Sequence, residues 1–412
     1  MSPLRNHGSY LKKKGIDIKR TSDRTYDIEI DLSERISYDQ DWIEVITFVL
    51  PTDLFPVHDC TEMTTIDTMT DGNAIWNAIT LDSLDTEALN QYMNTKDSSA
   101  NITNPGGYSL LYLVVANKSL DALRTLLMQP GVDINCLNGP EQETVLHAAC
   151  SKGLNDAVEL LIEKGALLDI KNSLGQPPIF KAIFSHSLKS VELLLGAGAD
   201  MSVTDATGNT LLHLAVSNHF EEAIPLLLSK GAKVNQQNAR GFSPLAVSIN
   251  FGFTDIAIAL MDGGADINQK VRFTTMLHHA ITWNRLPIIK QLLERGCEVN
   301  VVDAQEDTAV YIAVQQRKTD ILRYLLEEGK ANPCYMAINP VSTANLPLLY
   351  AANHGYTEIC ELLTTPTTAT PIIGKAAELS KWAGFPDTEA YLLDVVSQRV
   401  AGSKARPKPT LK

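Results

Sequence analysis

Apolar residues return along most of this chain with a period of about 33 residues. A hexapeptide with a polar first residue, two apolar residues and a final alanine occurs three times in nearly the same form. The copies are Thr144-Val-Leu-His-Ala-Ala, Thr210-Leu-Leu-His-Leu-Ala and Thr275-Met-Leu-His-His-Ala. Weaker copies start at 109, 177, 243, 308 and 346, which gives steps of 35, 33, 33, 33, 32, 33 and 38 residues. A regular step of this length indicates a repeat protein.

A second apolar element keeps the same spacing. About 17 residues after each hexapeptide begins comes an apolar pair and then glycine, as in Leu194-Leu195 followed by Gly198. The hexapeptide predicts a short helix that its first residue caps and its Leu and Ala residues bury. The apolar pair predicts a second helix, which the glycine ends. Between the two helices we expect residues that tolerate a positive φ and reverse the chain, namely Gly153, His219, Gly252, Asn284 and Gly355.

The ends of the chain lack this pattern. Apolar and polar residues alternate from Tyr26 to Leu32, which predicts a half-buried strand in a non-repeat extension over 1–70. The repeat array is expected over 71–396. The segment 397–412 contains two prolines and five basic residues but no acidic residue, and it predicts a disordered basic tail.

Degenerate copies of the unit lie at both ends of the array. Asn73–Ala78 fits an upstream unit, and Lys375–Ser380 fits a shortened last unit. With these two copies the chain holds ten candidate repeats, and atypical outer units are expected of caps that close a stacked array.

The hexapeptide resembles the T-P-L-H-x-A signature of the ankyrin repeat, over about four-fifths of the chain. The resemblance implies an all-α solenoid of helix-turn-helix units joined by hairpin loops. The chain departs from the pattern in three places. Pro177-Pro178 replaces the capping Thr, Phe273 stands where a turn Gly is expected, and the loop Thr364–Pro371 is long.

Charge and composition exclude several classes of function. The net charge is −13, and an acidic body of this length would repel phosphate backbones, which argues against nucleic acid as the main ligand. The six cysteines form no C-x-x-C motif, as is usual in a reducing compartment. No apolar run approaches the roughly 20 residues that span a bilayer, and Met1–Arg20 lacks the apolar region of a signal peptide. We therefore expect a soluble protein of the cytoplasm, with the nucleus as the alternative.

Candidate catalytic and metal-binding groups are mostly explained by the repeat. The resemblance implies that His147, His213 and His278 hydrogen-bond the loops between repeats. No H-E-x-x-H motif, zinc-spaced Cys/His cluster, phosphate-binding glycine loop or G-x-S-x-G motif is present. The sequence therefore predicts a protein that is not an enzyme and has neither a cofactor nor a metal site.

The resemblance also implies a candidate modification, because ankyrin hairpins with the pattern Ala-Asp-Ile/Val-Asn are substrates of an asparaginyl hydroxylase. Asn268 matches that pattern best, followed by Asn135, Asn235 and Asn300. The alternative is that asparagine is present only because its side chain suits tight turns.

Stacked helix pairs leave a long concave face, whose natural ligand is another protein. Most residues expected on that face are small or polar, but five large residues stand out as candidate partner-binding residues: Phe184, Arg240, Phe242, Phe251 and Trp283. The alternative is that the aromatic side chains among them pack between neighbouring helices.

These features predict an intracellular scaffold or adaptor that binds a partner protein. One alternative is an inhibitor whose acidic array masks a basic segment of its target. Another is an endosomal trafficking scaffold, since Gly198-Ala-Asp-Met-Ser resembles units of an endosomal ankyrin protein. The basic tail predicts a solubilising segment, with weak contact to acidic lipid as the alternative.

Overall fold

The computed structural model describes residues 16–22, 25–30, 86–93, 101–334 and 346–404, and the chain divides into two compact units, Met1–Thr70 and Asp71–Lys412. In the first unit, β1 (Ile16–Ser22) and β2 (Thr25–Ile30) pair antiparallel, with Ile16 opposite Ile30. The strand predicted from the alternation after Tyr26 is therefore confirmed as far as Ile30. Leu32 lies outside the described residues.

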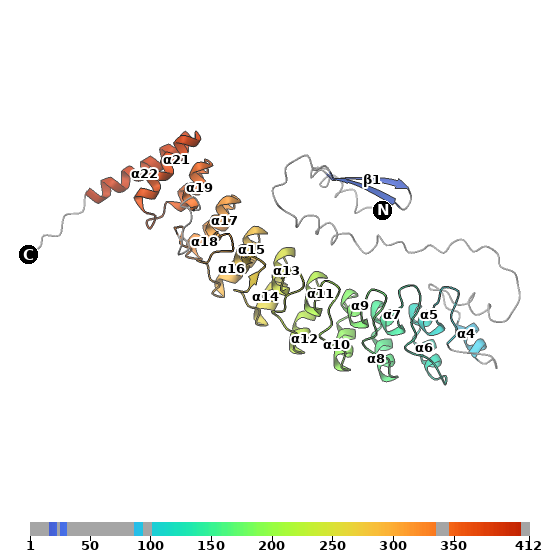
Figure 1. The fold of residues 1–412 in the computed structure, drawn as a ribbon. Coiled ribbons are helices and arrows are strands. Elements are labelled where there is room, and N and C mark those ends of the chain that lie inside the picture. The colour runs from blue at the N-terminus through green and yellow to red at the C-terminus, as the bar shows by residue number, and fades with distance from the viewer. Residues whose placement is uncertain (1–15, 23–24, 31–85, 94–100, 335–345, 405–412) are drawn as a thin grey trace, which may run out of the picture. The chain divides into compact units, whose positions relative to one another are not determined.

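The second unit is a row of helix pairs, drawn in Figure 1. Its first described helix, α4 (Thr86–Met93), stands alone. Eight pairs of similar length follow. Their first helices are α5 (Leu110–Ala116), α7 (Val145–Ser151), α9 (Pro178–Phe184), α11 (Leu211–Ser217), α13 (Pro244–Phe251), α15 (Met276–Thr282), α17 (Ala309–Gln315) and α19 (Pro347–Asn353). Their second helices are α6 (Leu120–Leu127), α8 (Asn155–Glu163), α10 (Leu188–Gly196), α12 (Ala223–Ser229), α14 (Thr254–Asp262), α16 (Leu286–Glu294), α18 (Thr319–Glu327) and α20 (Thr357–Leu363).

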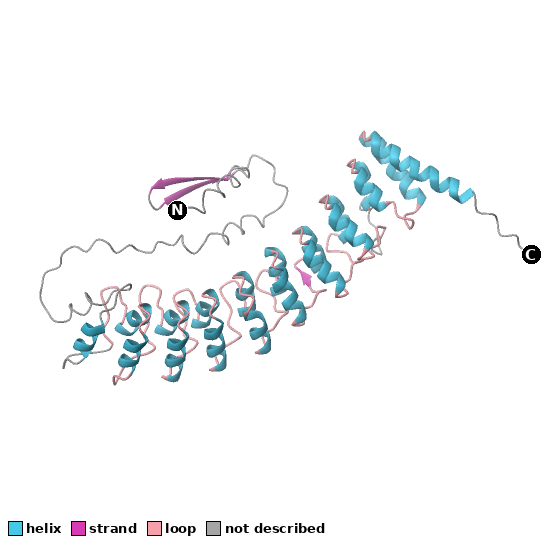
Figure 2. Cartoon of the chain, turned by 180° about the vertical axis from the view of Figure 1, so that it is seen from behind, coloured by secondary structure: helices cyan, strands magenta, loops and turns pink. Residues whose placement is uncertain are grey.

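A ninth pair, α21 (Thr370–Ala383) and α22 (Pro386–Lys404), closes the described array. With α4 at the place of an upstream second helix, this agrees with the predicted number of units. The first half of the upstream unit, Asn73–Ala78, lies outside the described residues. Figure 2 shows the pairs stacked side by side in a curved row, and the labels of Figure 1 place the first helices on the inner side of the curve.

In the eight pairs of similar length, each first helix begins where the hexapeptide predicts, whereas α21 begins five residues before the predicted hexapeptide Lys375–Ser380. In most units a Ser or Thr at its first position is the N-cap, and Thr275 and Thr308, for example, accept a hydrogen bond from the backbone N–H three residues on. In α9 no side chain caps the helix, and Pro178 takes its first position instead. Proline suits that position because its fixed φ is helical and its missing N–H would have no partner within the helix.

The chain reverses between the two helices through a residue with positive φ, as predicted. The five expected residues all have φ between 54° and 78°, and Lys118, His186 and Arg317 hold the same position in the other units. Five of the eight units thus accept a larger side chain in a left-handed conformation that glycine adopts without strain.

Two buried histidines, His147 and His213, connect neighbouring repeats, and His278 is buried at the equivalent position of a third repeat. Nε2 of His147 donates to the carbonyl oxygen of Gln176 at 2.9 Å, and Nε2 of His213 donates to that of Phe242 at 2.9 Å. His278 faces the backbone of Asp307, the residue at the same position one repeat on. In the first two, Nδ1 accepts the backbone N–H of the capping Thr, so the neutral imidazole serves both contacts. The structural role that the resemblance implied is therefore confirmed for His147 and His213.

The turns between helices form a second line of contacts. The ring of His219 stacks on Phe253 of the next repeat at 4.3 Å, and His186 stacks on Phe220 at 4.8 Å. Farther along, Arg285 takes the position equivalent to Phe253, and its Nε donates to the carbonyl oxygen of Ile249 at 2.9 Å. A cation at that point is favourable because the last carbonyls of a helix carry partial negative charge.

The C-terminal end differs from its prediction in two ways. The last pair is longer than the others, and α21 begins within the segment expected to be a long loop. Pro371 is tolerated there because it lies in the first turn of the helix, and Gly384, with φ of 81°, caps its C-terminal end. The tail expected to be disordered from Ser397 is helical up to Lys404, and Arg399 donates to the carbonyl oxygens of Thr364 and Thr365 at 3.2 and 2.6 Å. Arg399 therefore holds the long loop after α20. Residues 405–412 lie outside the described residues.

Within the residues described, no helix combines the length and the apolar character needed to cross a bilayer.

The register of the repeats can be tested at Leu212, which is 1% exposed in α11. We expect Leu212→Ala to lower the free energy of unfolding by about 2–5 kcal/mol, because it leaves a cavity in a close-packed core. Leu174→Ala is the control, because Leu174 is 67% exposed and its replacement leaves no buried cavity. We expect this variant to lower the free energy of unfolding by less than about 0.5 kcal/mol. Equal losses in urea denaturation would contradict this register.

The buried histidines predict acid sensitivity. Burial lowers the pKa of His147, His213 and His278, so between the lowered values and about pH 6.5 the unfolded chain binds more protons than the folded chain. Their contribution to stability is complete above about pH 6.5 and is lost as the pH falls below it. Asp307 opposes this effect, since burial raises the pKa of its carboxyl group to about 6. We expect the urea midpoint to fall between about pH 7.5 and 5.5, and to fall less after His213→Asn. A midpoint that does not change over this range would contradict the prediction.

Candidate partner-binding surface

Two of the predicted partner-binding residues, Phe242 and Trp283, belong to one strip of rings. The ring of Phe242 lies 5.7 Å from that of His279, and His279 lies 6.4 Å from Trp283 in an edge-to-face arrangement. His279 and Trp283 are four residues apart, at the end of α15, and therefore share a helix face. Phe242 precedes α13 in the neighbouring repeat. All three side chains are half-buried, so the strip crosses from one repeat to the next with part of each ring exposed.

The same two positions hold different chemistry elsewhere in the array. Glu143 precedes its hexapeptide as Phe242 does, and Lys181 occupies the place of His279 in the following repeat. These two side chains form an ion pair at 2.7 Å, and the hydroxyl of Tyr112 donates to Glu143 at 3.3 Å. Burial and the nearby carboxylate raise the pKa of Tyr112. One contact between neighbouring repeats is thus ionic near the start of the array and aromatic near its centre.

Arg240 lies beside the strip, in the hairpin that carries Phe242. Asn238 accepts the backbone N–H groups of both residues, at 3.0 and 3.1 Å, and so fixes the shape of the hairpin tip. In the next hairpin, the guanidinium of Arg272 lies over the ring of Phe242, 5.6 Å from its centre. This arrangement is a cation–π contact.

The hairpin of Arg272 corrects the expectation for Phe273. It is a tight hairpin in which β3 (Lys270–Val271) pairs with β4 (Thr274–Thr275), and its positive φ of 55° lies at Arg272. The step to this hexapeptide is 32 residues instead of 33, so the left-handed position moves back by one residue. Phe273 consequently stands at the tip, 69% exposed.

Phe184 and Phe251 are not part of the strip. Phe184 packs edge-on against the buried Phe180, with ring centres 6.4 Å apart. Phe251 stacks on Phe253 at 5.3 Å and so belongs to the contacts at the turns. Each of the two is 39% exposed. Phe251 is thus more exposed than Phe242 and Trp283, which are half-buried and pack against the core, and partner binding by all of these residues stays a prediction.

Sequence reasoning missed several residues of this face. His279 is one of them, although its distance of four residues from Trp283 predicts contact on one face of a helix. Trp382 was also missed, and it is 88% exposed. In the unit that starts at Lys375 it holds the position that Phe184 holds in its own unit. The same count of positions would have found it.

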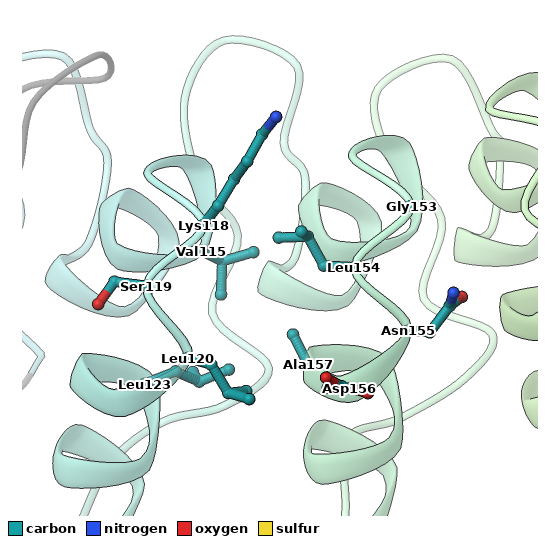
Figure 3. A pocket seen from close by; sticks show the side chains of 10 residues that line it. All are labelled: Val115, Lys118, Ser119, Leu120, Leu123, Gly153, Leu154, Asn155, Asp156 and Ala157. Carbon is teal, nitrogen blue, oxygen red and sulfur yellow. The ribbon is translucent and has the colours of Figure 1, made fainter.

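A shallow hollow of about 310 Å³ lies between the turns of the α5–α6 and α7–α8 pairs. Figure 3 shows that its walls come from two neighbouring repeats, with Lys118 on one turn and Leu154 on the other. Leu154 holds the position of Phe220 and Phe253, so a smaller side chain occupies the place of those rings. The hollow is therefore explained by packing. Among the described residues, no group of three or more His, Cys, Asp and Glu side chains is arranged to hold a metal ion.

Comparison with known proteins agrees with this geometry. The family model for ankyrin repeats in three copies matches four overlapping segments, residues 110–205, 188–271, 212–303 and 277–371, which together cover more than half of the chain. The chain belongs to the ankyrin-repeat family. The predicted family and the all-α solenoid fold are thereby confirmed, and ankyrin repeats generally mediate protein–protein interaction.

The curated relatives share short parts of the ankyrin array. The ankyrin repeat protein FPV219 of Fowlpox virus (strain NVSL) is 30% identical over 91 residues, which cover 22% of this chain and 20% of the relative. The BRCA1-associated RING domain protein 1 of Caenorhabditis elegans is 39% identical over 70 residues, which cover 17% and 10%. Serine/threonine-protein kinase 12 of Arabidopsis thaliana is 38% identical over 80 residues, which cover 19% and 17%. This chain thus spans a fifth or less of each relative.

Two solved structures resemble the array. The ankyrin repeat domain of Bcl-3, described as a unique member of the IkappaB protein family, has a TM-score of 0.48 at 28% identity. That match covers 52% of this chain and 97% of the Bcl-3 chain. The ankyrin repeat domain of human ASB11 has a TM-score of 0.44 at 27% identity, and its match covers 49% and 90%.

The four asparagines proposed for hydroxylation all bind the next ankyrin repeat. Oδ1 of Asn268 accepts the backbone N–H of Glu298 at 3.0 Å, and Oδ1 of Asn235 accepts that of Asp266 at 2.8 Å. Asn135 and Asn300 accept the N–H groups of residues 167 and 332 in the same way, each at 2.8 Å. This gives asparagine a structural role at each position. Hydroxylation stays a prediction, and all four side chains lie at the surface or half-buried.

The structural role can be tested at Asn268, because the chain supplies a matched replacement. Asp169 holds the equivalent position in another repeat, where its Oδ1 accepts the N–H of Asp200 at 3.0 Å. We expect Asn268→Asp to leave the free energy of unfolding almost unchanged, and Asn268→Ala to lower it by about 0.5–1.5 kcal/mol. Chemical denaturation measures both. Equal losses for Asp and Ala would show that the acceptor oxygen is not what position 268 requires.

Proposed function

We propose that this chain is a scaffold or adaptor that holds a partner protein against the side of its first helices, with Phe242, His279 and Trp283 at the centre of contact. The observation that carries this proposal is the strip of rings across two repeats. Its rings contact one another and remain partly exposed, whereas the positions that correspond to Phe242 in the two neighbouring units hold Asn209 and Thr274. Aromatic side chains at such partly exposed sites dominate the energy of many protein interfaces.

The physical basis of the proposal is preorganisation. Each ring of the strip is held by its neighbour and by a helix end or hairpin, so little side-chain entropy remains to be lost when a partner binds. The concave side of a solenoid presents such side chains at intervals of one repeat, which suits an extended segment or a helix of another protein.

We propose that the role is binding without catalysis. The two alternatives, an inhibitor that masks a basic segment and an endosomal trafficking scaffold, stay predictions, as do the cytoplasmic location and a contact between the basic tail and acidic lipid. Of the five basic residues in that tail, Arg399 binds the loop after α20 and is therefore less available to a membrane.

The strip can be tested through Trp283. We expect Trp283→Ala to weaken binding of a partner by at least about 1–2 kcal/mol, because the change removes a large partly exposed ring. A partner would be identified by affinity purification from the native cell with mass spectrometry, and its affinity then measured by calorimetry. Gln316→Ala is the matched control, since Gln316 holds the same position in the next repeat and is exposed.

Trp283 also packs partly against the core, so its replacement should lower the unfolding midpoint slightly, and by less than Leu212→Ala does. A large loss of stability with unaltered affinity would place Trp283 in the core and contradict the proposal.

A further inference from the structure

Basic side chains gather around the aromatic strip, in a chain whose net charge is −13. Arg240 lies at the tip of one hairpin, and Lys270 and Arg272 lie in the next hairpin. Lys270 and Arg272 are exposed and Arg240 is half-buried. Together with the rings they form a cationic aromatic patch, which consists of Arg240, Phe242, Lys270, Arg272, Phe273, His279 and Trp283.

The hairpins on either side of the patch carry carboxylates, and these carboxylates hold their own loops together. Asp205 accepts hydrogen bonds from the backbone and side chain of both Thr207 and Asn209, at 2.8–2.9 Å. Asp303 accepts the backbone N–H groups of Gln305 and Asp307 at 2.9 and 3.0 Å. These carboxylates are therefore held in their own turns, and the two hairpins between them carry the cationic side chains of the patch.

The patch is rigid in its backbone. The hairpin tips are joined in pairs, since the N–H of Ala239 donates to Thr207 at 3.0 Å and that of Ala304 donates to Phe273 at 2.9 Å. Gln237 also donates to the carbonyl oxygen of Lys270 at 2.8 Å and so ties the two basic hairpins together. The positions from which Arg240 and Arg272 extend are thus fixed relative to each other.

We propose that this patch binds a short acidic segment of a partner protein in which a large apolar side chain lies between carboxylates. This inference rests on the proposed function and adds the chemistry of the partner. A guanidinium group binds a carboxylate through two parallel hydrogen bonds, and the guanidinium carbon of Arg272 lies 5.6 Å from the centre of the Phe242 ring. The exposed ring of Phe273 and the edge of Trp283 supply apolar contact for the side chain between the carboxylates.

Charge complementarity favours an acidic peptide over nucleic acid. The basic groups of the patch are confined to two adjacent hairpins, whereas the array as a whole is acidic and would repel a long phosphate backbone. A short acidic peptide would be attracted by the patch and would extend little beyond it, because charges farther away than about 10 Å are largely screened at physiological salt.

The experiment uses the full chain and a short fluorescein-labelled peptide in which Phe and Leu are flanked by Asp and Glu, with fluorescence anisotropy as the readout. Two further probes are the same peptide with Lys in place of every acidic residue and a single-stranded RNA oligonucleotide. We expect the acidic peptide to bind most tightly and to lose affinity as salt is added.

The variants assign the binding to the patch. We expect Arg240→Glu and Arg272→Glu each to weaken binding of the acidic peptide by at least about tenfold, and Phe273→Ser by about threefold or more. Arg323→Glu is the matched control, because Arg323 is exposed on α18, outside the patch, and undergoes the same change of charge. Unfolding midpoints of all four variants show whether each one is folded.

Several outcomes would overturn the inference. The first is that the lysine peptide binds more tightly than the acidic peptide, which would favour the inhibitor alternative. The second is that the RNA binds more tightly than the acidic peptide. The third is that the wild type and the two arginine variants bind the acidic peptide equally well. Self-association that the same two variants abolish would make a second copy the occupant and would also overturn it. A partner protein retained equally by the wild type and the arginine variants, but lost in Trp283→Ala, would overturn this inference and leave the proposed function standing.

Discussion

No helix pair of this array can bury its apolar face alone, and the whole second unit depends on that constraint. Leu212 and its equivalents are buried because the preceding and following pairs cover them. Stability therefore comes from contacts between neighbours, so that the array approximates a row of coupled units rather than a single core. Polar side chains also couple neighbouring repeats. His147, for example, hydrogen-bonds a backbone carbonyl of the next repeat, and Asn268 accepts a backbone N–H of the next repeat.

Because a few positions carry the coupling between repeats, others are free to differ. Glu143 and Lys181 form an ion pair at the two positions where Phe242 and His279 bring rings together. The backbone beneath the two pairs is the same, so changing one pair alters the chemistry of the face without altering the fold. This separation explains how one solenoid can present acidic, basic and aromatic regions along its length, and why its function depends on particular side chains rather than on the architecture.

Aromatic and cationic side chains also lie at the turns between helices, where they join one repeat to the next. His219 on Phe253 stacks one repeat on the next, and Arg285 binds the carbonyl oxygens at the end of α13. Phe251 also contacts this line through Phe253, and partner binding by Phe251 stays a prediction. Phe251 and Trp283 hold equivalent positions of their repeats, so their neighbours account for their different contacts. Phe251 stacks on Phe253, whereas Arg285 takes the place of Phe253 in the repeat of Trp283 and the Trp283 ring meets His279.

The sequence by itself determined the period, the family, the all-α solenoid and the residues of each turn, because these follow from local preferences repeated in register: a capping Thr, a buried Leu pair and a residue that tolerates positive φ. It also singled out Phe242 and Trp283. Only the tertiary structure decided which large side chains meet, since Phe242 comes from one repeat and Arg272 and His279 from the next, and their contact depends on how one pair stacks on the next. The same holds for Phe273, which a hairpin one residue shorter placed at an exposed tip, and for Arg399, whose partners lie in a loop more than thirty residues away.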